Sequence, residues 1–123
     1  MSAVVKVYIA APYPEREAAQ AVMRDLENQI GFEVTSTWLR EMDELADAYA
    51  RLDLADVGRA DVLVALNPSA WTNTGTGGRH VEFGYALALG KRIVLVGERS
   101  NIFHYLSDVV VVPNVASLPG VLR

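Results

Sequence analysis

The sequence predicts an α/β protein whose parallel sheet is covered by helices on both faces. Short runs rich in β-branched residues recur along the chain, and segments with helical spacing of apolar residues separate them. One of these runs, DVLVAL at Asp61–Leu66, has no polar alternation, which is typical of a central parallel strand. The 123 residues are enough for one domain with a hydrophobic core, so we expect a single domain over residues 1–123.

Two strands and two helices are predicted in the amino-terminal half. The run Val4–Ala10 (VVKVYIA) indicates a buried first strand, which the prolines that follow it prevent from continuing. Apolar residues at helical spacing predict a helix from Glu15 to Ile30, and Gly31 is typical of a helix stop. Phe32–Trp38 (FEVTSTW) has the β-branched content of a strand. Asp43–Ala60 is rich in alanine and leucine and opens with acidic residues, which favours a second helix.

The carboxyl-terminal half continues this alternation. Its predicted elements are, in order, the strand Asp61–Leu66, the loop Asn67–Gly78, the helix Arg79–Gly90, the strand Arg92–Val96, a short turn or helix at Asn101–Leu106, the strand Asp108–Val112 and a short helix after Asn114. Five strands joined by right-handed crossovers favour a flavodoxin-like, doubly wound sheet of order 2-1-3-4-5. Ligands in such sheets bind outside the carboxyl ends of the strands, so we expect the site at the loops that follow the first, third and fourth strands.

Composition excludes several classes of function. The net charge of −4 argues against a nucleic-acid partner and against a basic membrane-binding patch. No run of about 18 apolar residues exists, so we expect no membrane span. The absence of cysteine removes disulfides and thiolate chemistry and is compatible with a cytoplasmic protein. His80 and His104 are the only histidines, too few for a zinc site, and we expect neither a metal nor a cofactor.

A glycine-rich stretch, TGTGGRHVEFGYALALGKR at Thr74–Arg92, precedes and includes the helix that follows the third strand. Such glycines either cradle a phosphate or let a loop turn closely onto a helix. The stretch is not a P-loop, because Lys91 lies too far downstream. It is not a dinucleotide fingerprint either, because that motif follows the first strand, where this chain has AAPYPE.

Glu82 is an acidic residue in the predicted first turn of an otherwise apolar helix. A buried carboxylate costs several kcal/mol unless something stabilises it, and the free N–H groups and dipole of a helix start would keep it ionised. It is either a capping carboxylate or a nucleophile. Asp53, eight residues before Asp61, is either an exposed helix residue or a site residue. Tyr8 is either a core tyrosine or a phenol that binds a carboxylate or a sugar oxygen.

Taken together, these segments resemble the nucleoside 2-deoxyribosyltransferase family. The resemblance rests on YIAAP, on DL followed by ADVLV, on the stretch from GG through E-F-GYALALGKRIVLV, and on SN, and it extends from Val4 to about Leu106. The related 2′-deoxynucleoside 5′-monophosphate N-glycosidases share the pattern. It implies that a glutamate attacks the anomeric carbon, displaces the base and forms a covalent glycosyl-enzyme intermediate, from which another base or water takes the sugar.

The resemblance also implies roles for individual residues. Glu82 matches the nucleophile, Asp53 matches the residue that handles protons at the leaving base, and Tyr8 matches the tyrosine that positions the nucleophile. Asn101 matches an asparagine that reaches the 5′ end of the sugar from a neighbouring subunit. The resemblance therefore implies a homodimer or higher homo-oligomer with a shared active site, and the helix Arg79–Gly90 is the expected interface.

The remaining candidates concern substrate binding. Thr76 lies six residues before the nucleophile, where transferases often have an aspartate and the hydrolases have a serine. Thr76 therefore favours hydrolysis, whereas Asn101 favours transfer. Trp71, in a polar loop, is the predicted base-stacking residue, whereas Trp38 is expected in the core. The other expected substrate-binding residues are Gly77, Gly78, Pro12, Arg16 and Ser100; Arg16 and Arg79 are the arginines that could meet a phosphate.

Three functions follow for a protein whose partners are a small nucleoside or nucleotide and a nucleobase. The first is transfer of a 2-deoxyribosyl group to another base through Glu82. The alternative within this class is hydrolysis of a 2′-deoxynucleoside 5′-monophosphate to free base and deoxyribose 5-phosphate. The alternative from another class is a non-catalytic nucleotide-binding module that has kept the fold.

Overall fold

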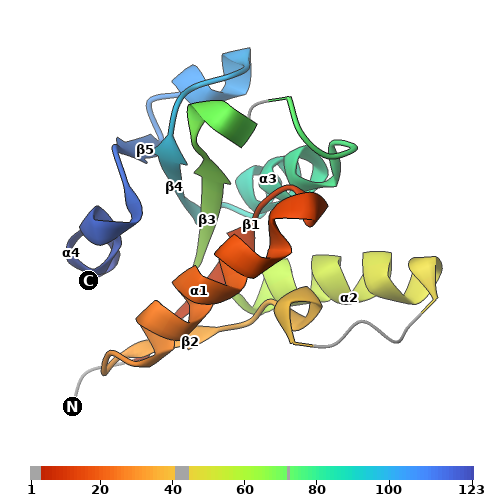
Figure 1. The fold of residues 1–123 in the computed structure, drawn as a ribbon, viewed down its shortest axis with the longest axis horizontal. Coiled ribbons are helices and arrows are strands. Elements are labelled where there is room, and N and C mark those ends of the chain that lie inside the picture. Colours follow the sequence, from red (N-terminus) through yellow and green to blue (C-terminus); the bar gives the residue numbers. More distant parts are fainter. Residues whose placement is uncertain (1–3, 41–44, 72) are drawn as a thin grey trace.

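The structure, a computed structural model, describes residues 4–40, 45–71 and 73–123. Within them, one parallel sheet has the strand order β2-β1-β3-β4-β5 (Figure 1), which confirms the predicted flavodoxin-like α/β fold. The strands are β1 (Val5–Ala10), β2 (Phe32–Val34), β3 (Val62–Asn67), β4 (Arg92–Gly97) and β5 (Val109–Val112). Every residue of β3 is buried between β1 and β4, which explains why this strand lacks polar alternation.

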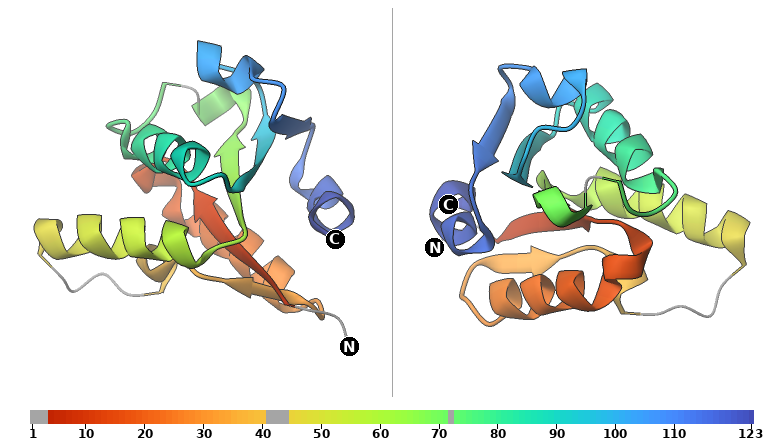
Figure 2. Two further views of the ribbon diagram at one scale, coloured as in Figure 1. Left: turned by 180° about the vertical axis from the view of Figure 1, so that it is seen from behind. Right: turned by 45° about the horizontal axis from the view of Figure 1, so that its top comes forward.

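Helices cover both faces of this sheet. They are α1 (Arg16–Glu27), α2 (Ala46–Arg59), α3 (Gly78–Ala88) and α4 (Leu118–Leu122), and short 3-10 turns join them: η1 (Tyr13–Glu15), η2 (Thr37–Leu39), η3 (Ser69–Trp71), η4 (Ile102–Tyr105) and η5 (Val115–Ser117). Figures 1 and 2 show α1 on one face and α2 with α3 on the other. None of the helices described is long and apolar enough to cross a membrane.

Chain topology explains why α2 and α3 share a face. The crossovers from β2 to β3 and from β3 to β4 run in the same direction across the sheet, whereas the crossover from β1 to β2 runs in the opposite direction. Right-handed crossovers in the same direction place their helices on the same face. Residues of α2 therefore face residues of α3, and β1 passes beneath both helices.

The second strand is shorter than predicted. It ends at Val34, and Thr37–Leu39 forms η2 instead of continuing the strand to Trp38. The backbone N–H of Thr37 donates to Asp56 Oδ2 of α2 at 2.8 Å, which bends the chain away from the sheet. This contact joins residues far apart in the sequence, and a local pattern does not show it.

Helix boundaries also differ from the predictions. α1 ends at Glu27, three residues before the predicted Ile30, because the carbonyl of Gly31 must pair with the N–H of Val5 at 2.8 Å and the chain turns before it. α3 begins at Gly78 instead of Arg79. The predicted start of the second helix at Asp43 lies outside the described residues, and the described helix begins at Ala46.

Gly97 ends β4 against the end of β3. Its φ of 113° belongs to the left-handed region, and a Cβ at this position would lie 2.3 Å from the carbonyl oxygen of Asn67. The buried amide of Asn67 donates to the Glu98 carbonyl at 2.6 Å and to Ser100 Oγ at 3.0 Å. These contacts hold the carboxyl ends of β3 and β4 together at the edge of the sheet where a ligand is expected.

Candidate active site

A cavity of about 460 Å³ lies between α2, α3 and the loop after β1. Its lining comes from four segments that are far apart in the sequence: Ala11, Pro12 and Tyr13; Trp38; Ala46, Tyr49, Ala50 and Asp53; and Thr74, Thr76, Gly77, Gly78, Arg79 and Glu82. The loop after β1 and the loop after β3 both contribute, as the sequence predicts. The loop after β4 does not line this cavity.

Asp53 and Glu82 line the cavity, and Tyr8 contacts Glu82 from β1 without lining it. The phenol of Tyr8, wholly buried on β1, donates a hydrogen bond to Glu82 Oε2 at 2.7 Å. The Glu82 carboxyl group also makes a side-chain hydrogen bond with Asp53 on α2. The structure therefore brings together the three residues to which the resemblance assigns catalysis, from β1, α2 and α3.

Burial raises the pKa of Glu82 to about 8. The neighbouring charges of Asp53 and Asp56 raise this pKa further, while the hydrogen bond from Tyr8 lowers it. The predicted first-turn position, where the helix dipole would keep the carboxylate ionised, is wrong. Because α3 begins at Gly78 and not at Arg79, Glu82 lies one residue further along the helix, just beyond its first turn, and no acidic residue occupies that turn. Desolvation therefore dominates its ionisation.

Asp53 and Glu82 affect each other's ionisation. Burial raises the pKa of Asp53, the charge of Asp56 raises it too, and the hydrogen bond with Glu82 lowers it, as expected for the acceptor of that bond. The two neighbouring carboxyl groups both have raised pKa values, so the pair holds a proton more tightly than two separate carboxyl groups would. The pKa of Tyr8 is raised mainly by burial, so its phenol stays a donor to Glu82.

Four of the predicted substrate-binding residues line the cavity, and four do not. Pro12, Thr76, Gly77 and Gly78 belong to its wall, and Gly75 packs closely against Pro12. The four that lie elsewhere are Arg16, Ser100, Asn101 and Trp71.

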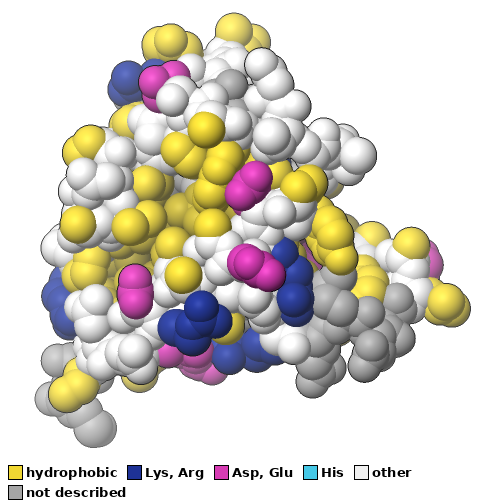
Figure 3. Space-filling model, viewed as in Figure 1, with side chains coloured by type: hydrophobic (Ala, Val, Ile, Leu, Met, Phe, Trp, Pro, Cys, Tyr) yellow, Lys and Arg dark blue, Asp and Glu magenta, His cyan; other side chains and the backbone are white. Residues whose placement is uncertain are grey.

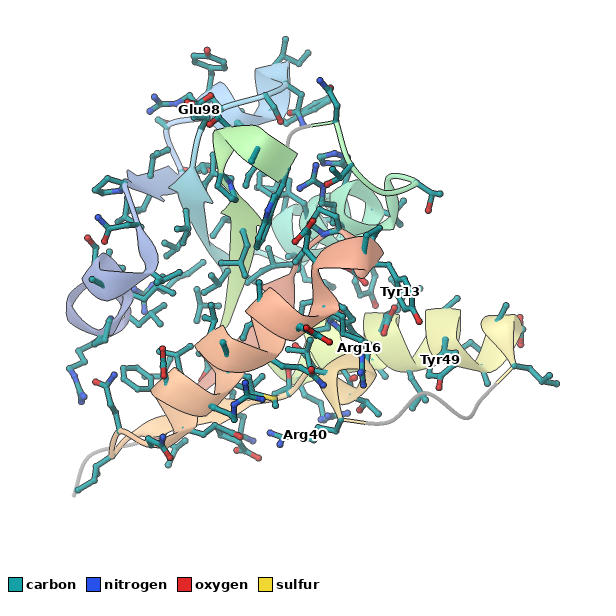
Figure 4. The ribbon with its side chains drawn as sticks, viewed as in Figure 1. Tyr13, Arg16, Arg40, Tyr49 and Glu98 are labelled. Atoms are coloured by element: carbon teal, nitrogen blue, oxygen red, sulfur yellow. The ribbon has the colours of Figure 1, made fainter. Side chains whose placement is uncertain are left out.

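The two arginines considered for phosphate binding both donate to backbone carbonyls. Arg16, whose side chain is labelled in Figure 4, donates from Nε to the Trp38 carbonyl at 2.9 Å. Arg79 is buried in the wall, donating from Nη2 to the Trp71 carbonyl at 2.8 Å and from Nη1 to Asn67 Oδ1 at 3.0 Å. Both guanidinium groups hold segments of the cavity wall in place.

Trp38 is buried in the core, as predicted, and it also borders the candidate site, whereas Trp71 does not. Trp38 lines the cavity beside Asp53, with its indole N–H donating to the Ile9 carbonyl at 3.0 Å. Trp71 instead lines a separate, largely apolar cavity of about 400 Å³ beside α1 and the ends of β3, β4 and β5. Figure 3 shows hydrophobic side chains gathered in a hollow on the face where α1 lies in Figure 1.

Asn101 and Ser100 lie beyond the carboxyl end of β4. The Asn101 side chain caps η4 by accepting the N–H of Phe103 at 2.9 Å. With Phe103 it borders a third cavity, of about 450 Å³, against His80, Gly84 and other residues of α3. Ser100 Oγ accepts from Asn67 and holds β3 and β4 together.

Sequence reasoning missed two tyrosines and one aspartate near the site. Figure 4 labels Tyr13 of η1 and Tyr49 of α2, and both line the cavity. Tyr49 lies four residues before Asp53, a helical spacing that could have identified it. Asp56 is wholly buried below the site, and its sequence position among exposed helix residues did not indicate this. In the described part of the chain, no group of three acidic or histidine residues could hold a metal ion.

The sequence model of the nucleoside 2-deoxyribosyltransferase family matches residues 7–112. The chain belongs to this family. The matched segment includes Tyr8, Asp53 and Glu82. No curated protein matches the chain significantly.

Two solved structures are similar to this nucleoside 2-deoxyribosyltransferase family member. The Clostridium botulinum CMP N-glycosidase BcmB has 27% sequence identity and a TM-score of 0.62, with 87% of this chain and 86% of that chain covered. The protein BlsM has 24% identity and a TM-score of 0.67, with 99% and 90% covered, and supports the fold alone. The family therefore includes relatives that act as N-glycosidases.

Proposed function

We propose that this chain hydrolyses the N-glycosidic bond of a 2′-deoxynucleoside 5′-monophosphate, with Glu82 as the nucleophile. The observation that carries the proposal is the contact of Glu82 with both Tyr8 and Asp53 at the wall of one cavity. A carboxylate with a positioned donor and an adjacent carboxylic acid has the groups that displacement at an anomeric carbon requires.

Each step of the reaction balances. A Glu82 oxygen attacks C1′ as the bond from C1′ to the base nitrogen breaks, and Asp53 gives its proton to the departing base. This leaves a glycosyl ester on Glu82. Asp53, now a carboxylate, then takes a proton from water, whose oxygen attacks C1′ and breaks the ester. The products are the free base and deoxyribose 5-phosphate, and both carboxyl groups return to their starting state.

The reaction needs the charge on Glu82 and the proton on Asp53. The pKa values of both groups are raised, so the pair can supply the proton that the departing base takes. A sugar that develops positive charge next to Glu82 favours the arrangement with the carboxylate on Glu82. The hydrogen bond from Tyr8 stabilises the resulting carboxylate.

The base is expected to lie along α2. Ala46, Tyr49, Ala50 and Asp53 follow one another at helical spacing on the wall of the cavity, and Trp38 borders the same space. Small and aromatic side chains suit the flat face of a nucleobase, and Asp53 lies on the same wall. Asp53 Oδ1 is buried and has no hydrogen-bond partner among the described residues, which suits a group that exchanges protons with a bound base.

The sugar phosphate is expected at the start of α3. Thr76 offers a hydroxyl, and Gly77 and Gly78 offer backbone N–H groups at the amino end of an eleven-residue helix. The similarity to the CMP N-glycosidase BcmB, together with Thr76 in place of the aspartate frequent in transferases, supports water as the acceptor and a nucleotide as the substrate.

Transfer to a second base is the other candidate, and the description of the matched family favours it. A panel of nucleosides and 5′-monophosphates, with deoxyribose and ribose, should be incubated with and without an acceptor base, and released bases separated by chromatography. Base release from deoxynucleoside monophosphates without an acceptor is the expected result. Exchange that requires an acceptor base would replace hydrolysis by transfer, and no release from any compound would favour a nucleotide-binding module.

We further propose that two copies of the chain associate through α3. Val81, Tyr85 and Leu89 lie at helical spacing on its outer face, with exposed fractions of 66%, 37% and 46%. Phe103 of η4 is 56% exposed and borders a cavity with His80, Gly84 and Leu87 on another side of α3. Exposed apolar side chains gathered on one helix are typical of an interface. Asn101 borders the same cavity as Phe103, which agrees with a role in the site of a neighbouring copy.

A further inference from the structure

Asp56 is a buried charge directly below the candidate active site. Its side chain is wholly inaccessible to solvent, although it lies on α2 only one turn beyond Asp53. One carboxylate oxygen accepts the N–H of Thr37 at 2.8 Å, and the other lies 2.8 Å from Nη2 of Arg59. A buried carboxylate is retained at a cost in stability, and nothing in the reaction described above uses it directly.

The contacts of Asp56 tie α2 to the chain after β2. The carbonyl of Asp56 accepts the hydroxyl hydrogen bond of Thr35 at 2.9 Å, and Arg59 donates to the Thr35 carbonyl at 3.3 Å. Together with the Thr37 contact, these bonds hold the segment that continues into Trp38. Since Trp38 and Asp53 both line the cavity, Asp56 holds two of its walls in a common position.

The charge of Asp56 also acts on the catalytic groups. It raises the pKa of Glu82, of Asp53 and of Tyr8, in each case as a smaller contribution than burial. A third negative charge nearby makes it harder for the Asp53–Glu82 pair to lose its last proton. The reaction proposed above requires that proton on the pair when substrate binds.

We propose that Asp56 is a positioning residue of this site: its hydrogen bonds anchor the Trp38 wall to α2, and its buried carboxylate places a negative charge one helical turn from Asp53. This role rests on the proposed function, because only a reaction that uses the Asp53–Glu82 pair needs such a charge. Arg59 is the counter-charge, and its side chain is 56% exposed to solvent while Asp56 is buried. The arginine therefore neutralises the carboxylate only in part.

The other charged groups around the pair come from each element packed against it. On α2 these groups are Asp56 and Arg59. The phenol of Tyr8 belongs to β1, and the guanidinium group of Arg79 belongs to α3. The chain after β2 contributes only the uncharged Thr35 and Thr37. Arg79 donates to the carbonyls of Leu66 and Trp71, so its position is set by the wall. Substitutions at Asp56 and Arg59 thus change the field at the pair without removing a group that touches substrate.

Two variants with opposite charge changes test the proposal. Asp56→Asn keeps an oxygen for the N–H of Thr37 but removes the negative charge, whereas Arg59→Met removes the positive charge. The titration of the Glu82 carboxyl carbon should be followed by ¹³C NMR, with Glu82→Gln used for assignment. We expect the titration and the alkaline limb of the kcat/KM profile to move to lower pH in Asp56→Asn and to higher pH in Arg59→Met.

The matched control is Asp47→Asn, on the same helix. Asp47 forms an exposed ion pair with Arg51, both side chains being 79% exposed, so this variant changes the net charge equally without touching the buried network. Its titration should equal that of the wild type. If Asp56→Asn also titrates like the wild type, or if the two test variants shift in the same direction, the proposal is wrong.

Failure of the proposal is distinguishable from failure of the proposed function. Base release by the wild type tests the function, whereas the NMR titration needs no turnover. Opposite shifts without base release from any nucleotide would keep the charge effect and overturn the reaction. If Asp56→Asn does not fold, Arg59→Met still decides, because a titration unchanged from the wild type in that variant overturns the proposal.

Discussion

Glu82 is a largely buried carboxyl group, whereas most buried side chains in proteins are apolar. Its neighbours are a phenol that donates to it and a carboxyl group that is hydrogen-bonded to it. In its protonated form Glu82 can accept from Tyr8 and donate to Asp53 at the same time. Glutamine can make the same two hydrogen bonds with nearly the same shape, so it is the informative substitution at this position.

Glu82→Gln should remove catalysis and preserve the fold. An amide is not a nucleophile and cannot form the glycosyl ester, so kcat should fall by roughly 10³-fold or more. Intact-mass measurement of the wild type with substrate should show a deoxyribose phosphate adduct that the variant lacks. Glu98→Gln, on the exposed residue labelled at the top of Figure 4, is the control and should keep full activity. Full activity of Glu82→Gln would exclude Glu82 as the nucleophile.

The raised pKa of Glu82 also predicts how stability depends on pH. The folded value of about 8 exceeds the reference value of 4.5, so the folded state binds the proton more tightly than the unfolded state. The contribution of Glu82 to the free energy of unfolding should therefore be greatest below pH 4.5. As the pH rises towards 8, this contribution should fall by on the order of a few kcal/mol. Urea denaturation between pH 5 and about 9 measures this, and the Glu82→Gln variant should lose this part of the dependence.

At the scale of secondary-structure elements, α2 has two functions on two faces. Ala46, Tyr49, Ala50 and Asp53 line the cavity, while Asp56 and Val57 are buried against the chain after β2 and the sheet. The short η2 turn depends on this second face, because its first N–H is bound by Asp56. The position of Trp38 is thus a property of the contact between two elements.

The junction of β3 and β4 gives a stability prediction. Gly97→Ala should destabilise the protein by roughly 3 kcal/mol or more, since φ is +113° and the new Cβ would clash with the Asn67 carbonyl. Gly58→Ala is the matched control: Gly58 is exposed on α2 with nothing within 4 Å of a Cβ, and helix propensity should stabilise that variant by about 0.5–1 kcal/mol. Equal unfolding midpoints for the two variants would contradict this account of Gly97.

At the scale of the whole molecule, sheet order assembles the site. The order 2-1-3-4-5 places α2 and α3 on one face above β1, so residues 8, 53 and 82 converge although they are far apart in the chain. The outer side of α3, away from the sheet, carries the apolar surface proposed as an interface. Figure 2 shows α3 at the front when the molecule is seen from behind.

Val81→Glu should weaken the proposed association of two copies. Val81 is the most exposed of the three apolar residues on this face, at 66%, and a buried unpaired charge in an interface is strongly unfavourable. Sedimentation velocity over a range of concentrations should show a dimer for the wild type and a shift to monomer for the variant. Glu33→Gln on the exposed side of β2 serves as control. A monomeric wild type at every concentration would refute the interface.

Local patterns in the sequence predict most of the architecture. The unbroken apolar run of β3 and the helical spacing in α1 and α2 predicted the elements, because periodicity depends on neighbouring residues. The sheet order followed from their alternation and from the right-handed crossover rule. The resemblance identified Tyr8, Asp53 and Glu82 as a group, and the structure brings them into contact. Their roles in catalysis stay predictions that the experiments above test.

Only the tertiary structure decided the features that depend on distant contacts. Trp38 rather than Trp71 lines the cavity, because Asp56 ends β2 early and Arg16 holds the turn from the other side. Burial, which no local pattern reports, raises the pKa of Glu82 to about 8. The sequence alone predicts instead that the helix dipole keeps this group ionised. Sequence thus determined which groups are present and on which elements, and packing decided their environment and charge, since desolvation and long-range hydrogen bonds arise only when the chain folds.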